Sequence, residues 1–252
     1  MNQVTKIALI CLTLLFVASC SNKKDSLADS NYSPEELFKI GSGNLEAGRY
    51  KKAKEYFIKI NQEYPYSKEA QKAQYLEGLA NYNLKAYEEA SAALNEYIEL
   101  YPAGEEIENA YYLKALCYYD QIIEVRLDQN VAERALEALK AVVERFPNGI
   151  YAQDANLKID LVYDQLAGKE MSVGRFYLKK NIIAGAINRF QNVVKEYPTT
   201  SYIEEALYRL VESYLTLGIK AEAEKYASIL GKNYPSGKWY KMSYSLIKNN
   251  EK

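Results

Sequence analysis

Aromatic side chains recur along the chain at intervals of 37 residues, close to polar residues. One series consists of Phe38, Tyr75 and Tyr112. A second series consists of Leu45, Tyr82 and Tyr119, which are followed by the polar residues Glu46, Asn83 and Asp120. Rings beside hydrogen-bonding groups suit an extended peptide, whose side chains alternate and whose backbone needs partners. The alternative is that these rings pack between repeated units, in a chain with 25 tyrosines, and both can hold for different rings.

The composition argues against other kinds of chemistry. Histidine is absent, which removes the most frequent general base and metal ligand. The formal net charge is −1, so the chain lacks the basic excess typical of nucleic-acid-binding proteins. Cys117 lies in an apolar run at 110–123 and is expected to be a buried free thiol. We therefore expect no enzyme, no cofactor and no nucleic-acid partner; an enzyme would need an acid pair in a cleft with a raised carboxylate pKa.

The elements that position the aromatic series are indicated by the prolines. Five of the six prolines follow an aromatic residue, in the pairs Tyr64-Pro65, Tyr101-Pro102, Phe146-Pro147, Tyr197-Pro198 and Tyr234-Pro235. Proline stops a helix, because it has no N–H donor and its ring clashes with the preceding turn. A helix stop at a nearly regular interval indicates one supersecondary unit repeated along the chain.

Small and large residues recur inside each period at helical spacing. Gly41, Gly78, Ala115, Gly174 and Val211 stand in the first half of each unit, Ala115 after allowance for an eight-residue insertion. Phe57, Leu94, Leu139, Phe190 and Ala227 stand eight residues before the prolines. This pattern predicts two packed helices in each unit, which approach closely at the small residue. Gly48 and Gly218 stand where a first helix ends and suit a left-handed cap.

The predicted helices cover 34–47, 50–63, 68–84, 87–100, 105–125, 130–146, 150–180, 182–196, 200–217 and 219–233. Ser33 before Pro34, with Glu36 behind it, is a capping-box start for the first of them. The segment 150–180 is interpreted as one long helix, although Gly168 and Gly174 leave a break as the alternative.

These units resemble tetratricopeptide repeats over residues 34–235, through the small residue, the turn, the alanine, the large apolar residue and the proline. The resemblance implies an all-α fold, a right-handed superhelical array of five helix pairs with about ten helices. We divide it into amino-terminal units at 33–146, with the peptide-binding groove, and carboxy-terminal units at 147–238. A polar tail is expected at 239–252.

The amino terminus is similar to that of bacterial lipoproteins. A weakly basic start precedes an apolar run at 7–17, which is too short to span a bilayer and fits a signal peptide at 1–19. The tetrapeptide at 17–20 resembles a lipobox, which implies cleavage before Cys20 and acylation of that residue. An ordinary signal peptide with an incidental cysteine is the alternative. Residues 20–32 would then form a lipidated tether with a reach of roughly 20 Å.

Together, Cys20, the opening segment 33–65 and the segment 188–200 resemble the BamD family, the repeat lipoproteins of the β-barrel assembly machinery in Gram-negative outer membranes. The resemblance implies a scaffold, lipid-anchored in the outer membrane and facing the periplasm. Its implied partners are the barrel protein BamA, unfolded outer-membrane proteins and other Bam lipoproteins. An adaptor lipoprotein of another envelope machine, such as a secretin pilot or a cell-wall-linked scaffold, is the alternative.

The resemblance also implies that the carboxy-terminal units bind BamA, with Arg189 of the Asn188-Arg189 pair as a contact. An arginine can bind a carboxylate in a planar, bidentate manner. This role requires a free guanidinium, so an internal ion pair of Arg189 would argue against it. A solvated surface arginine with no partner role is the other possibility.

Overall fold

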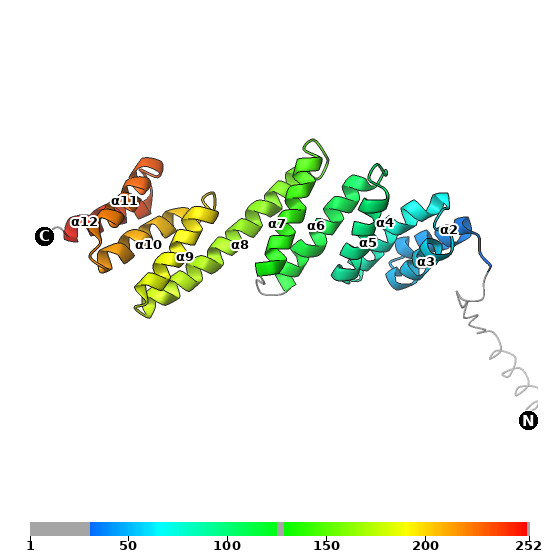
Figure 1. The fold of residues 1–252 in the computed structure, drawn as a ribbon, viewed down its shortest axis with the longest axis horizontal. Coiled ribbons are helices and arrows are strands. Elements are labelled where there is room, and N and C mark those ends of the chain that lie inside the picture. Colours follow the sequence, from blue (N-terminus) through cyan, green and yellow to red (C-terminus); the bar gives the residue numbers. More distant parts are fainter. Residues whose placement is uncertain (1–30, 125–128, 251–252) are drawn as a thin grey trace, which may run out of the picture.

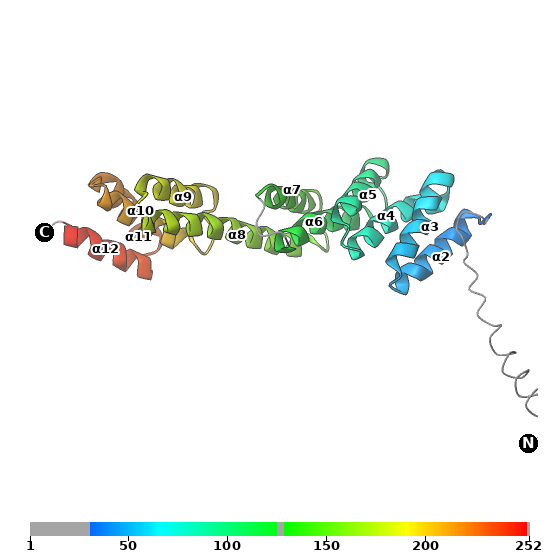
Figure 2. The ribbon, with the colours of Figure 1, turned by 90° about the horizontal axis from the view of Figure 1, so that it is seen from below.

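The computed structural model describes residues 31–124 and 129–250, and within these ranges every regular element is a helix. The helices are α2 (Pro34–Glu46), α3 (Tyr50–Glu63), α4 (Lys68–Asn83), α5 (Tyr87–Leu100), α6 (Ile107–Glu124), α7 (Gln129–Arg145), α8 (Ala152–Lys179), α9 (Ile183–Glu196), α10 (Ile203–Thr216), α11 (Lys220–Asn233) and α12 (Lys238–Asn250). Successive helices pair as units 1 to 5, from α2/α3 to α10/α11, and α12 follows the last pair. The units stack into an elongated array whose two ends carry the two ends of the chain (Figure 1, Figure 2).

The predicted all-α array of five helix pairs is confirmed, and each predicted helix boundary lies within three residues of the observed one. The aromatic residue before the proline closes the second helix in four units, where Tyr64, Tyr101, Tyr197 and Tyr234 are the C-caps. At the start of α2, Ser33 and Glu36 form the predicted capping box. The local signals for helix start and stop therefore set the unit boundaries.

The small residue of each first helix faces the large residue of its partner helix. A methyl group placed on Gly78 would lie 2.6 Å from Leu94 Cγ, and one on Gly174 would lie 2.4 Å from Phe190 Cε1. Gly41 has the same relation to Phe57, at 2.8 Å. In unit 5 the sizes are exchanged, because Val211 and the small Ala227 are both buried in one core cluster. The helix pairs thus keep a nearly constant packed volume while the residues vary.

Helix α8 is continuous across 28 residues, about 42 Å, so the predicted long helix is confirmed. Its first half, with Ile159 and Val162, belongs to the core shared with α6 and α7. Its second half, with Met171, belongs to the core shared with α9, α10 and α11. The helix therefore serves both halves of the array, and Figure 1 shows it crossing from one to the other.

In units 1, 2, 4 and 5 the turn between the paired helices contains a residue with positive φ. Gly48 and Gly218 have φ values of 70° and 73°, which confirms the predicted left-handed caps. Units 2 and 4 use Lys85 and Asn181 instead, with φ values of 60° and 58°. Asparagine tolerates this conformation better than most residues, which explains how unit 4 turns without a glycine.

The expected polar tail at 239–252 is wrong as far as residue 250. Residues 238–250 form α12, which packs on α10 and α11 through Trp239, Tyr240, Leu246 and Ile247. Apolar residues recur at each turn of this segment, which indicates a helix. The spacing of the prolines gives no information about a helix that follows the last of them. Elsewhere, Cys117 is the predicted buried free thiol. None of the described helices is long and apolar enough to cross a membrane.

Candidate peptide-binding face

The first helices of the units form one side of the array, which we call the inner face. Helix α4 contacts α2 and α6 as well as its paired helices, so the first helices of units 1 to 3 approach one another more closely than the second helices do. The array therefore curves toward its first helices. In stacked helical repeats this side usually forms the concave binding surface.

The first aromatic series lies partly buried between neighbouring helices. Phe38 packs with its ring centroid 6.1 Å from that of Phe57, and Tyr75 packs in the same way at 5.9 Å from Tyr97. Tyr112 stacks on Tyr151 with the ring centroids 4.2 Å apart. All three rings of the series are neither fully buried nor fully exposed. These rings can therefore both pack between helices and contact a peptide, which are the two possibilities that the sequence indicates.

Hydroxyl groups of the tyrosines tie successive first helices together. Tyr82 of α4 donates to Asp120 Oδ2 of α6 at 2.6 Å, and Tyr112 of α6 donates to Asp154 of α8. Asp120 thus accepts one hydrogen bond inside the protein, and its role in binding a peptide stays a prediction. Asn83 is exposed and donates to the backbone carbonyl of Leu79 at 2.8 Å.

The electrostatics keep these hydroxyl groups protonated. Burial raises the pKa of Tyr75 to about 12. Burial, followed by the hydrogen bond to a carboxylate, raises the pKa of both Tyr82 and Tyr112. The hydrogen bonds from Lys158 and then from Tyr112 lower the pKa of Asp154. At neutral pH each bond therefore joins a neutral donor to an ionised acceptor, which is the stronger kind of pairing.

Two exposed leucines extend this surface and were missed from the sequence. Leu157 and Leu161 of α8 have exposed fractions of 57% and 53%. Helical spacing places them on the same face of α8 as Asp154 and Lys158, and the Lys158 ammonium lies 5.3 Å from the centroid of the Tyr119 ring. Leu157 follows Tyr112 by 45 residues, which is the separation of Pro102 and Pro147. The sequence therefore indicates Leu157 as the next member of the first aromatic series, if the eight-residue insertion is added to the 37-residue interval.

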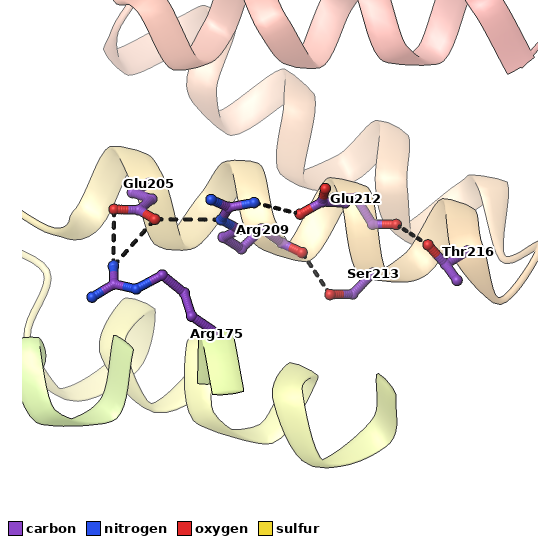
Figure 3. A network of polar contacts seen from close by, with 6 residues as sticks. All are labelled: Arg175, Glu205, Arg209, Glu212, Ser213 and Thr216. Carbon is purple, nitrogen blue, oxygen red and sulfur yellow. Dashed lines mark hydrogen bonds and ion pairs between the residues drawn. The ribbon is translucent and has the colours of Figure 1, made fainter. Parts of the chain in front are cut away.

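Charged residues form the inner face of units 4 and 5. Arg175 of α8 binds both carboxylate oxygens of Glu205 on α10, at 3.2 and 3.1 Å. Arg209 binds Glu205 at 3.3 Å and Glu212 at 2.8 Å, so the four side chains form one chain of alternating charge (Figure 3). A cleft of about 430 Å³ opens beside it and is lined by Arg175, Leu178, Lys179, Asn181, Ile183, Arg209, Glu212 and Thr216.

The expectation that Arg189 is free to bind a partner is wrong. Its Nη1 atom lies 3.2 Å from Glu170 Oε1 on α8, and Asn192 also donates to Glu170. The arginine side chain is 39% exposed, but its charge is already paired across the unit 4 helices. Arg189 stabilises the α8/α9 pair, and we assign it no partner contact. Cys20 lies outside the described residues.

Comparison with known proteins agrees with this architecture. The family described as "YfiO: Outer membrane lipoprotein" matches residues 30–229. The outer membrane protein assembly factor BamD of Rickettsia prowazekii is 45% identical, over 98% of each chain. The BamD of Caulobacter vibrioides is 43% identical, over 93% of this chain and 77% of that protein. A solved structure of a thermophilic TPR protein from Thermus thermophilus aligns with 85% of this chain and 98% of its own. The two are 18% identical in sequence, with a TM-score of 0.39. The chain belongs to the YfiO/BamD family of outer membrane lipoproteins.

Proposed function

We propose that this protein is a non-enzymatic scaffold lipoprotein that helps outer-membrane β-barrel proteins to fold and insert, by binding BamA and the targeting segments of unfolded barrels. The relatives are named as outer membrane protein assembly factors, which supports a role in the assembly of outer-membrane proteins. The inner face supports the binding of unfolded chains. The family resemblance and the surfaces described below support two further roles. The carboxy-terminal units would bind BamA, and the amino-terminal lipid would anchor the protein in the membrane.

The observation that carries the substrate proposal is the exposed apolar strip on α8. Leu157 and Leu161 stand one helical turn apart next to partly buried rings, and exposed apolar side chains that adjoin one another often mark an interaction site. An extended aromatic-rich segment can cover the leucines with alternate side chains, while Asn83 and Lys158 offer polar groups at the margin. Because each leucine is already about half buried, covering the rest of it contributes about 1–1.5 kcal/mol.

The test is binding of a fluorescent peptide from the carboxyl end of a barrel protein. The double variant Leu157→Asp/Leu161→Asp is expected to weaken binding at least about tenfold, since it places two charges against an apolar ligand. Tyr75→Ala is expected to weaken it less, because that ring is only partly accessible. The matched control is Leu100→Asp, which alters a side chain 59% exposed at the end of α5. Equal affinities of the leucine variant and the control would contradict the proposal.

BamA is proposed to bind the carboxy-terminal units. Apolar side chains are exposed there near the turns of units 4 and 5, namely Phe176, Ile182, Leu217 and Ile219. A photoreactive residue at Phe176 is expected to crosslink to BamA in cells, and one at Leu100 is not. Crosslinking to a secretin or a cell-wall protein instead would favour an adaptor of another envelope machine.

The lipid on Cys20 is proposed to hold the protein in the outer membrane, with the helical array in the periplasm. Cys20→Ser is expected to give unprocessed precursor or loss from the membrane fraction. Mass spectrometry of the mature amino terminus checks this, and an unmodified Cys20 would contradict it. Purification of the membrane complex identifies any other Bam lipoproteins that accompany the protein.

A further inference from the structure

Helix α12 is the one described helix without an acidic residue, and it ends the array. Its thirteen residues contain Lys238, Lys241 and Lys248 and no aspartate or glutamate. Across 220–250 the chain has six lysines against two glutamates, whereas 65–124 has four lysines against eleven acidic residues. A nearly neutral protein therefore carries a basic end and an acidic middle.

The lysines lie on the outward face of α12. Trp239, Tyr240, Leu246 and Ile247 pack into the core of unit 5, which fixes the opposite face toward solvent. That face carries the three lysines with Ser245, and it is bordered by Met242 and Tyr244, which are 44% and 59% exposed. We call these six residues the lysine stripe.

Charges of the lysine stripe are not neutralised within the described part of the chain. Lys238 lies over the Trp239 ring, with its ammonium 4.8 Å from the ring centroid. No carboxylate among residues 31–124 and 129–250 forms an ion pair with Lys238, Lys241 or Lys248, although ten lysines or arginines elsewhere in these ranges do form such pairs. The carboxylate of Glu204 lies beside Gly237, just before the helix begins, and forms no ion pair with these lysines.

We propose that the lysine stripe binds the anionic phospholipid surface of the membrane that carries the protein, and so holds the far end of the array against it. Membership of an outer membrane lipoprotein family places such a surface within reach. Lysines next to an anionic leaflet each contribute to binding, and a tyrosine at the edge suits the headgroup level. Helices α2 and α12 lie at opposite ends of the array (Figure 2). The lipid on Cys20 and the lysine stripe on α12 would then act as two membrane anchors. Two anchors together bind more stably than either alone, and they would lay the array along the membrane.

This inference rests on the proposed anchoring through Cys20, and the experiment separates the two. The mature lipidated protein is reconstituted in vesicles of phosphatidylcholine with about one third phosphatidylglycerol. Because Cys117 is buried, Ser245→Cys supplies the single accessible thiol for a fluorophore, and lipids with brominated chains report its approach to the bilayer. Ala92→Cys, exposed on α5 in the acidic middle, is the matched control.

Quenching is expected at position 245 and not at 92, and it is expected to disappear in pure phosphatidylcholine vesicles or at about 0.5 M salt. Neutralising each lysine to glutamine is expected to lower the binding constant about fivefold, so Lys238→Gln/Lys241→Gln/Lys248→Gln abolishes quenching. The fluorescence of Trp239, the chain's single tryptophan, shows that α12 stays packed in this variant.

A protein that fails to float with the vesicles refutes the anchoring on Cys20. A protein that floats without quenching at 245, or with equal quenching in neutral vesicles, refutes the lysine stripe. So does a triple variant that keeps its quenching but loses a protein partner, since the stripe would then be a protein interface.

Discussion

The inner faces of the two halves are built from different chemistry on the same kind of helix pair. In units 1 to 3 tyrosines donate to carboxylates, as Tyr82 does to Asp120, and the rings remain partly accessible. In units 4 and 5 arginines pair with glutamates, as Arg209 does with Glu205 and Glu212. Both arrangements join successive units. Only the first leaves apolar ring surface for a ligand, and the second leaves a charged cleft.

This difference indicates how one scaffold can serve two partners. A tyrosine whose hydroxyl joins two helices keeps part of its ring accessible, so on the proposed function the same residue would both stabilise the array and contact the peptide. An arginine already paired inside the protein, as Arg209 is with Glu205 and Glu212 and Arg189 is with Glu170, has less capacity left for an outside partner. The proposed recognition of BamA in the carboxy-terminal half therefore rests on exposed apolar residues such as Phe176 and Ile182.

The largest expected effect tests what the halves share. Phe57→Ala in unit 1 and Phe190→Ala in unit 4 are each expected to lower the free energy of unfolding by about 3–5 kcal/mol, because both rings are fully buried against a glycine. Urea unfolding followed by circular dichroism measures this. A cost below about 1 kcal/mol in either unit would show that the two cores are not equivalent.

Unit 5 provides the control for that experiment. It has a larger residue on the first helix, Val211, and a small one on the second, Ala227. Gly174→Val alone is expected to destabilise by about 1–3 kcal/mol through overpacking. Combined with Phe190→Ala, it should recover part of the lost stability, and simple addition of the two costs would contradict the exchange of sizes.

Breaking the charged inner face is expected to cost less. Arg209→Met removes one contact to each of two glutamates and leaves Glu205 with Arg175 alone, at an expected cost of about 1–3 kcal/mol. Because Arg209 also lies 5.9 Å over the Trp239 ring, tryptophan fluorescence should report loosening of α12. Arg175→Met is the control, since that side chain is 40% exposed and has one partner. An equal cost for both would mean that the network is not centred on Arg209.

The repeat architecture was predictable because its signals are local. Aromatic-proline pairs stop helices and small residues face large ones, so Gly78 and Leu94 could be paired before any contact was seen. Helix α12 was missed because it has no proline behind it, and its apolar residues were judged as a tail. Side-chain partners were less predictable. The spacing gives no sign that Asp120 and Arg189 each have a partner on a neighbouring helix, because such partners depend on how the helices stack.

Breaking the tyrosine–carboxylate face is expected to cost less again. Tyr82→Phe keeps the ring and removes the hydrogen bond to Asp120, at about 0.5–1.5 kcal/mol. A double-mutant cycle with Asp120→Ala isolates the coupling. Peptide binding by Tyr82→Phe should change less than binding by the leucine variant of α8. A coupling near zero would mean that units 2 and 3 are joined by packing alone.

The smallest effect at neutral pH, and a specific one at high pH, is expected for Tyr75→Phe. The folded protein holds the Tyr75 hydroxyl protonated, with a pKa of about 12 against about 10 when unfolded, because burial opposes the charge. Since the raised pKa belongs to the folded state, its contribution to stability is complete below pH 10 and is lost as the pH rises from about 10 to about 12. Tyr75→Phe should therefore flatten the decline of unfolding free energy across that interval and leave the value at pH 7 nearly unchanged. Tyr66→Phe, at a fully exposed tyrosine, is the control that should leave the whole curve in place. Identical alkaline curves for the wild type and both variants would show that the ring of Tyr75 is solvated, and that the inner face of the amino-terminal units is more open than its packing against Tyr97 indicates.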